Sequence, residues 1–182
     1  MKRTNVDYSK HVVTETKSDG LLVHHFGEPS TSCNSMTFIN TNGIMAVTGD
    51  FGNWIFCREF HPSPTGRVSD GYWHEKLRNS STQDGTVYDS DATQIAVQAE
   101  IDGGYADYGY TGTELEEMIE YGKECLELVH DKYAYELFAH REMPHGDIES
   151  VSCVYKTHVW LEYIFDGFDE ICLRMKENLT EI

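Results

Sequence analysis

The chain has 182 residues and a formal net charge of −17, with 40% hydrophobic and 12% aromatic residues. This length is enough for one well-buried domain, and the apolar content argues against intrinsic disorder despite the high charge. The acidity argues against direct nucleic-acid binding, because such binding depends on basic side chains that neutralise phosphates.

Three features bear on the compartment. The first ten residues, MKRTNVDYSK, are not followed by the apolar run of a secretory leader, and no run of 18 apolar residues exists. The five cysteines are an odd number and contain no C-x-x-C pair, which favours a reducing environment. We therefore expect a cytoplasmic protein that does not bind membranes.

The N-terminal third has β character. Residues 1–18 are polar and indicate either a poorly ordered segment or a terminal arm. Four short apolar runs follow: Leu21–Phe26, Ser35–Asn40, Ile44–Thr48 and Trp54–Phe60. Asn42-Gly43 lies between two of these runs, and Asn-Gly in that position is a strong hairpin signal. Residues 19–60 are therefore predicted to form an antiparallel meander of about four strands.

Residues 61–112 are predicted to mix loops with short elements. Asp70–Leu77 is expected to be a short helix. Thr93–Ile101 alternates apolar and polar residues, which indicates a strand, although a helix is the alternative. Glycines at positions 103, 104, 109 and 112 indicate that the tyrosine-rich stretch between them is a flexible loop.

Residues 113–182 are predicted to be mainly helical. Thr113 and Glu116 have the spacing of a capping box, and apolar residues follow at the helical period. A second helix is predicted at 132–142, with Ala134, Leu137 and Phe138 inward. A third is predicted at 157–177, with its inward side chains at Trp160, Ile164, Phe168, Ile171 and Met175.

Strands followed by helices are typical of an α+β fold. We predict a single domain over residues 1–182, in which an N-terminal antiparallel β-meander precedes a mainly helical, acidic C-terminal part. Its segments are an arm at 1–18, the meander at 19–60, a mixed region at 61–112 and the helices at 113–182.

The charge is unevenly distributed. Residues 1–60 have a net charge of −1, and residues 61–182 carry the remaining −16. Between Arg78 and Lys123, 44 consecutive residues contain no Lys or Arg but ten carboxylates and five tyrosines. Without nearby counter-charges, this segment is expected to project a negative field.

A row of glutamates follows within the predicted helix. Glu117, Glu120, Glu124 and Glu127 have the spacing of a single helical stripe. Five like-charge pairs in this helix cost roughly 0.2–0.5 kcal/mol each, or about 1–2.5 kcal/mol together. Solubility alone does not require this cost, so the stripe is either a solvated outer face or a surface that binds a basic partner.

On the second interpretation, carboxylates take the place of phosphates in a basic groove, and tyrosines add contact area. The predicted partner-binding residues are Asp84, Asp89, Asp91, Asp102, Tyr105, Asp107, Tyr108, Tyr110, Glu114, Glu117, Glu120, Glu124 and Glu127.

Enzymatic chemistry has weaker support. Asp89, Asp91 and Glu100 resemble oxygen ligands of a calcium loop, but Gln94 stands where that loop needs glycine. These three residues define an alternative hypothesis, a small nuclease-like, metal-dependent enzyme. Nucleophile, phosphate-loop and dinucleotide motifs are lacking in the sequence, so no catalytic residue, metal ligand or cofactor is predicted in the main hypothesis.

Residues 24–77 resemble a group of small proteins encoded by phages and prophages. The shared pattern is a G-x-P-x-T/S-S segment, a strand, an N-G-like turn, and then strand–GD–[FL]–G–strand. The matching positions here are Gly27, Pro29, Thr31, Ser32, Gly43, Gly49, Asp50, Phe51 and Gly52. These positions cover less than a third of the chain and specify a hairpin, not a chemistry.

Over its whole length the chain resembles anti-CRISPR proteins of the type II-A class, which inhibit Cas9. The resemblance implies a phage-derived, non-enzymatic protein in the cytoplasm of the bacterial host, with Cas9 or the Cas9–guide RNA complex as its partner. Cas9 holds nucleic acid in positively charged channels, which an acidic protein can occupy. A phage accessory protein that binds another basic host protein remains the other alternative.

Overall fold

The structure is a computed structural model, and it describes residues 2–80, 85–145 and 152–180. The chain forms two compact units. Unit 1 consists of Met1–Gly85 and Thr157–Ile182, and unit 2 is the intervening segment Thr86–Lys156. The single domain predicted over residues 1–182 is thus divided in two, with unit 2 inserted into the sequence of unit 1. The α+β fold class is as predicted.

Unit 1 contains a six-stranded antiparallel meander in which each strand pairs with its neighbours in sequence. Its strands are β1 (Val12–Ser18), β2 (Leu21–Gly27), β3 (Met36–Thr41), β4 (Ile44–Gly49), β5 (Trp54–Phe56) and β6 (Leu77–Ser80). The four predicted strands correspond to β2–β5. The predicted hairpin turn is also present, with φ of 50° at Asn42 and 81° at Gly43. Two successive positive φ values match the right-handed twist of the paired strands.

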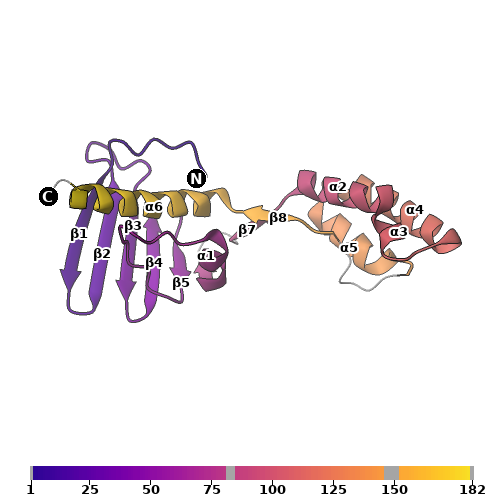
Figure 1. Cartoon of the computed structure of the whole chain (residues 1–182), viewed down its shortest axis with the longest axis horizontal. Helices are drawn as coiled ribbons and strands as arrows, with labels where there is room; N and C mark the ends of the chain where they lie inside the picture. The colour runs from indigo at the N-terminus through magenta and orange to yellow at the C-terminus, as the bar shows by residue number, and fades with distance from the viewer. Residues whose placement is uncertain (1, 81–84, 146–151, 181–182) are drawn as a thin grey trace. The chain divides into compact units, whose positions relative to one another are not determined.

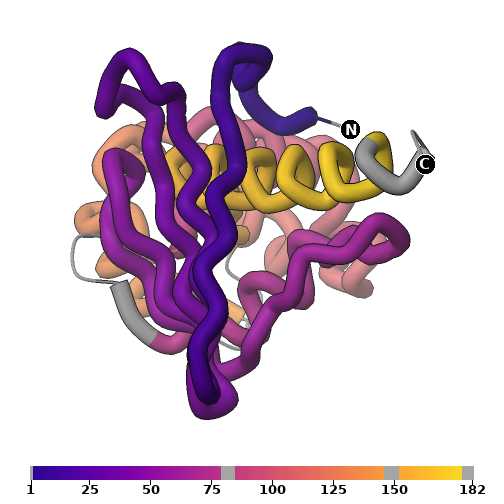
Figure 2. Tube along the Cα trace, turned by 90° about the vertical axis from the view of Figure 1, so that its left-hand side faces the viewer, coloured from indigo at the N-terminus to yellow at the C-terminus, as the bar shows by residue number. Residues whose placement is uncertain are grey.

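One face of this sheet carries the core of unit 1. Two helices complete the core, α1 (Asp70–Lys76) and α6 (Val159–Thr180), and α6 crosses the strands (Figure 1). Figure 2 shows α6 and the loop ahead of α1 on the same side of β1. Trp73 stacks between Phe60 and Phe165, with ring centroids 4.3 and 5.0 Å away. Within the described residues, no helix combines the length and apolar character needed to cross a bilayer.

Residues 1–18, for which either a poorly ordered segment or a terminal arm is predicted, make specific contacts with the rest of unit 1. Arg3 and Thr4 are tied to the carboxylate of Asp166 on α6, which accepts hydrogen bonds from both backbone amides at 2.7–3.0 Å. Arg3 also donates from Nη1 to Asp166 at 3.1 Å and to Asp169 at 3.0 Å. Further along, residues 12–18 form edge strand β1. The β-branched residues at positions 12, 13, 14 and 16 are the feature of the sequence that indicates this strand.

Unit 2 is mainly helical. It contains β7 (Thr86–Tyr88), α2 (Ser90–Ala99), the π-helical turn η1 (Glu100–Gly104), α3 (Tyr105–Asp107), α4 (Gly112–Leu128), α5 (Lys132–Glu142) and β8 (Tyr155–Thr157), whose last residue belongs to unit 1. The strands β7 and β8 pair with each other. Buried tyrosines connect the helices: Tyr121 of α4 donates to the carbonyl of Ala139 in α5 at 3.0 Å.

In unit 2, one open alternative is resolved and two local predictions need correction. Of the two alternatives for residues 93–101, the helix is the one observed, because Ser90–Ala99 is helical and the chain continues into η1. The tyrosine-rich stretch is not simply a loop, since α3 forms within it. The capping box at Thr113 is absent: α4 begins at Gly112, and Thr111 is its N-cap without a side-chain hydrogen bond.

The helix boundaries were predicted better than the buried faces. Helix α5 has the predicted bounds, but its buried residues are Tyr135 and Ala139, and Leu137 is exposed. In α6, Ile164, Phe168 and Ile171 are buried as predicted, whereas Trp160 and Met175 are only partly buried. The buried face of α6 is completed by residues that were not predicted: Leu161, Phe165 and Cys172.

The stability of unit 1 is predicted to fall at mildly acidic pH. Burial lowers the pKa of His24, His74 and His158, although a bond to Glu15 opposes this effect at His24. A histidine with a lowered pKa in the folded state binds protons more readily when the chain is unfolded. Protonation therefore favours unfolding once the pH drops below the ordinary histidine pKa of about 6.5.

The urea midpoint of unit 1 should accordingly be level above pH 7 and should decrease between pH 7 and 5. Tryptophan fluorescence measures it, because Trp54 and Trp73 are buried in unit 1. The variant His24→Gln should flatten the dependence. A midpoint that stays constant or rises on acidification would contradict the prediction.

Candidate functional site

The negative charge is concentrated in unit 2. Its 71 residues contain sixteen carboxylates and four Lys or Arg, a net charge of −12, whereas unit 1 carries the remaining −5. Lys123 and Lys132 each pair with a carboxylate of their own helix, at 3.0 and 3.8 Å, and Lys156 pairs with Asp89 at 3.1 Å. Even with these local pairs, carboxylates outnumber basic groups fourfold, so unit 2 has a strongly negative surface.

The most regular part of this surface is on α4. We call Glu117, Glu120, Glu124 and Glu127 the acidic stripe, and all four side chains are exposed. The opposite face of α4 is buried through Met118, Tyr121, Gly122 and Cys125. Because the core holds one face, the stripe is kept on the other by the rigidity of the helix. Within the described part of the chain, the stripe makes ion pairs between Glu120 and Lys123 and between Glu117 and His145.

A close approach fixes α4 against η1. A Cβ atom at Gly122 would lie 2.7 Å from Cγ1 of Ile101 and 3.1 Å from the hydroxyl of Tyr105. Any larger residue at this position would have to displace these two side chains, so glycine lets α4 pack closely against Ile101 and Tyr105. The contact holds η1 and α3 beside the helix that carries the acidic stripe, and η1 and α3 themselves carry the exposed carboxylates of Asp102 and Asp107.

The predicted tyrosines have different environments. Tyr105 is 4% exposed, and burial raises the pKa of its hydroxyl above the ordinary value. Tyr110 is partly buried and donates to the carbonyl of His145 at 2.9 Å. Tyr108 is 69% exposed. Of the three, Tyr108 is the one that a partner can reach fully, and Tyr105 belongs to the core.

We expect Tyr105→Ser and Tyr108→Ser to have opposite consequences. Removing the buried ring of Tyr105 leaves a cavity and should destabilise unit 2 by about 3–5 kcal/mol. Tyr108→Ser should change stability by less than about 0.5 kcal/mol, as exposed substitutions usually do. Urea unfolding followed by far-UV circular dichroism measures both. Equal losses of stability would show that the burial of Tyr105 does not contribute as proposed.

The carboxylates proposed for the nuclease-like alternative are separated by a helix. Asp89 is the N-cap of α2, and its Oδ1 accepts from the backbone amide of Ala92 at 3.1 Å. Glu100 lies at the other end of α2, about 16 Å away at 1.5 Å of rise per residue. The two carboxylates therefore cannot hold one metal ion. Across residues 2–80, 85–145 and 152–180, no three His, Cys, Asp or Glu side chains are grouped to bind a metal.

Most of the remaining predicted residues are exposed. We call the exposed predicted residues of unit 2 the acidic surface: Asp91, Asp102, Asp107, Tyr108, Glu114 and the acidic stripe. Asp84 lies outside the described residues. Asp89 is only partly exposed, because it caps α2 and pairs with Lys156.

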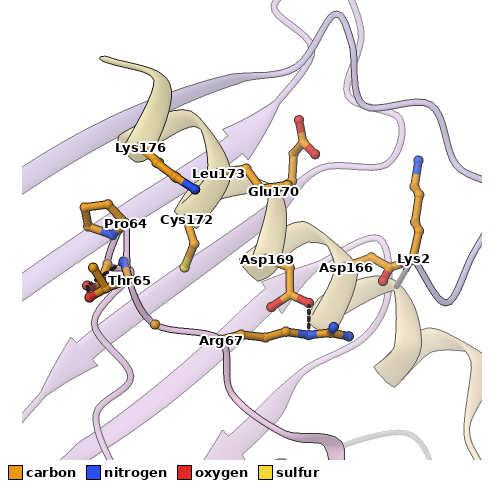
Figure 3. A pocket seen from close by; sticks show the side chains of 12 residues that line it. Lys2, Pro64, Thr65, Arg67, Asp166, Asp169, Glu170, Cys172, Leu173 and Lys176 are labelled. Atoms are coloured by element: carbon orange, nitrogen blue, oxygen red, sulfur yellow. Dashed lines mark hydrogen bonds and ion pairs between the residues drawn. The ribbon is translucent and has the colours of Figure 1, made fainter. Parts of the chain in front are cut away.

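Unit 1 contains a pocket of about 350 Å³ between α6 and residues 63–67, which the sequence did not predict (Figure 3). Both signs of charge line it, and they come from Lys2, Arg67, Lys176, Asp166, Asp169 and Glu170. Arg67 Nε lies 3.3 Å from Asp169 Oδ2. Because these opposite charges offset one another, the lining of the pocket favours neither an anionic nor a cationic ligand. Its residues come from three distant parts of the chain, which no local pattern reveals.

Nucleophilic chemistry has no support at the buried thiol of α4. Burial raises the pKa of Cys125 to about 11, so this side chain is a neutral thiol at physiological pH. The comparisons add no further information about function: no protein-family model, no curated protein and no solved structure matches this chain.

Proposed function

We propose that this protein is a non-enzymatic, phage-derived inhibitor of Cas9 and that it binds the effector through the acidic surface of unit 2. The observation that supports the proposal most directly is the acidic stripe, four exposed glutamates on one face of a helix whose other face is buried. The resemblance to type II-A anti-CRISPR proteins suggests the partner.

The chemistry of the acidic surface suits a groove that normally holds nucleic acid. Carboxylates on a rigid helix can pair with arginine and lysine side chains that otherwise contact phosphates. The successive glutamates of the stripe are three or four residues apart, which corresponds to about 4.5–6 Å along the helix. Exposed Tyr108, directly after α3, offers an aromatic contact of the kind found in interface hot spots. Inhibition then results from occupying the groove and requires no covalent step.

The decisive experiment mixes the purified chain with guide-loaded Cas9. We expect a complex on size-exclusion chromatography and a loss of target DNA cleavage. The complex should weaken between low and moderate salt, because exposed charges are screened. Observing neither a complex nor a loss of cleavage would reject the proposal.

A pull-down from host lysate, with and without Cas9, distinguishes the remaining alternative. Retention of Cas9 by the wild-type chain, and its loss when the acidic stripe is neutralised, supports the proposal. Stripe-dependent retention of a different basic protein, with Cas9 left unbound, would mean that the acidic surface binds a partner but that this partner is not Cas9.

A further inference from the structure

The sheet of unit 1 has a second face that α6 does not cover. In β1–β5, the side chains of the covered face include buried Phe38, Val47 and Trp54. Because side chains alternate along a strand, the residues between them point to the opposite side. We call these residues the outer face: Val12, Thr14, Thr16, Ser18, Leu21, Val23, His25, Thr37, Ile39, Thr41, Ile44, Ala46, Thr48 and Ile55.

The register of the strands shows that the outer face is continuous. One cross-strand row runs through Thr16, Val23, Ile39, Ala46 and Ile55. A second row runs through Thr14, His25, Thr37 and Thr48, and a third through Ser18, Leu21, Thr41 and Ile44. The apolar side chains are accessible on both sides of the patch, since Val12 is 45% and Ile55 40% exposed.

The composition of the outer face contrasts with the rest of the chain. None of its fourteen residues is Asp, Glu, Lys or Arg, although a quarter of all residues are charged. Half of the fourteen are Val, Ile, Leu or Ala, and five of the others are threonines. A continuous surface of this kind, without charges to desolvate, can pack against a copy of itself.

We propose that the outer face is a homodimer interface, on which a second copy of this chain packs sheet against sheet. The negative charge of the chain favours this packing of one outer face on the other. Two chains of net charge −17 repel each other, and the outer face lets them meet without placing like charges in contact. Pairing through edge strand β1 is disfavoured, because Glu15 and Lys17 are charged side chains on that edge.

The area of the outer face indicates how tightly the two copies should bind each other. Five strands spaced by about 4.8 Å and about six residues at 3.3 Å give a patch of roughly 24 by 20 Å. Two such patches cover roughly 1,000 Å², close to the lower limit for a specific interface. The dimer should therefore be weak and depend on concentration in the micromolar range.

Sedimentation velocity of the full chain over a range of concentrations tests the inference without Cas9. We expect a monomer–dimer equilibrium that shifts toward dimer as salt is added, because salt screens the repulsion between two acidic chains. This trend is opposite to the one expected for Cas9 binding. Hence the dimer can fail while the proposed function stands, and the reverse is also true. A chain that stays monomeric at every concentration and salt would overturn the inference.

Two variants locate the interface. Thr37→Lys on the central strand and Thr14→Lys on the edge strand each place an unpaired charge on the outer face. Each should weaken the dimer by about tenfold or more, because a charge without a partner would be desolvated in the uncharged interface. Thr113→Lys, the same exchange at an exposed position of α4, is the matched control and should leave the dimer intact. If a folded outer-face variant dimerises as tightly as the control, the interface lies elsewhere.

Discussion

Changing all four glutamates of the acidic stripe to glutamine is expected to stabilise unit 2 and at the same time to weaken its binding to Cas9. Glutamine has nearly the helix propensity of glutamate, so the helix itself tolerates the change. The substitutions remove five like-charge pairs, which stabilises the helix. This stabilisation is partly offset because Glu120 loses its contact with Lys123 and Glu117 its contact with His145. The net gain in the free energy of unfolding should be about 1 kcal/mol. Far-UV circular dichroism during urea unfolding measures it.

Binding should move in the opposite direction. The dissociation constant should rise by about tenfold or more, and its dependence on salt should decrease, since four charge-assisted contacts are lost. The control neutralises four acids of unit 1 through Asp19→Asn, Glu28→Gln, Glu75→Gln and Glu177→Gln. It removes the same net charge and leaves the stripe unchanged. Equal weakening in the control would indicate a general effect of net charge, and wild-type binding by the stripe variant would identify the stripe as a solvated face.

The second large effect is expected at Asp166, whose side chain is 2% exposed. Its carboxylate accepts hydrogen bonds from the backbone amides of Arg3 and Thr4, from the Thr4 hydroxyl and from Arg3 Nη1. In Asp166→Asn, an NH₂ group takes the place of one acceptor oxygen and faces these donors. Breaking such a buried charged pair typically costs 3–5 kcal/mol, and we expect about 3 kcal/mol because Asp169 and Asp70 still pair with Arg3.

The matched control for this prediction is Asp70→Asn. Asp70 bonds the same guanidinium at 2.5 Å, but its side chain is 52% exposed. Solvent screens this pair, so its loss should cost less than about 1 kcal/mol. Tryptophan fluorescence during urea unfolding compares the two variants, because Trp54 and Trp73 report on unit 1. Similar losses in both variants would show that burial does not set the strength of the Arg3 contacts.

Several local features could be predicted from the sequence because short-range chemistry specifies them. Asn42-Gly43 requires two positive φ values, which few other residue pairs adopt, and the hairpin forms there. The adjacent His24 and His25 point to opposite faces of the sheet, one buried and the other exposed. Both observations follow from backbone geometry alone.

Local patterns left the structure open in one helix of unit 2 and misled about the buried face of another. Thr93–Ile101 alternates like a strand, but buried Thr93 and Val97 are four residues apart and lie on one face of a helix. The helix is favoured because Asp89 caps its N-terminus and because α4 covers that face. In α5, the apolar Leu137 was expected inside, but packing against α4 buries Tyr135 and Ala139 instead.

The sequence by itself determined the acidity of the protein, the position of its charged segment and four of the six strands of the meander. These depend on composition and on spacings of a few residues. Only the tertiary structure decided that the N-terminal residues dock on Asp166, that Tyr105 is in the core while the acidic stripe faces outward, and that strands β1–β5 share an uncharged outer face. The physical reason is that these properties depend on which distant residues exclude water from a side chain, and burial of this kind is settled by packing between elements far apart in the chain.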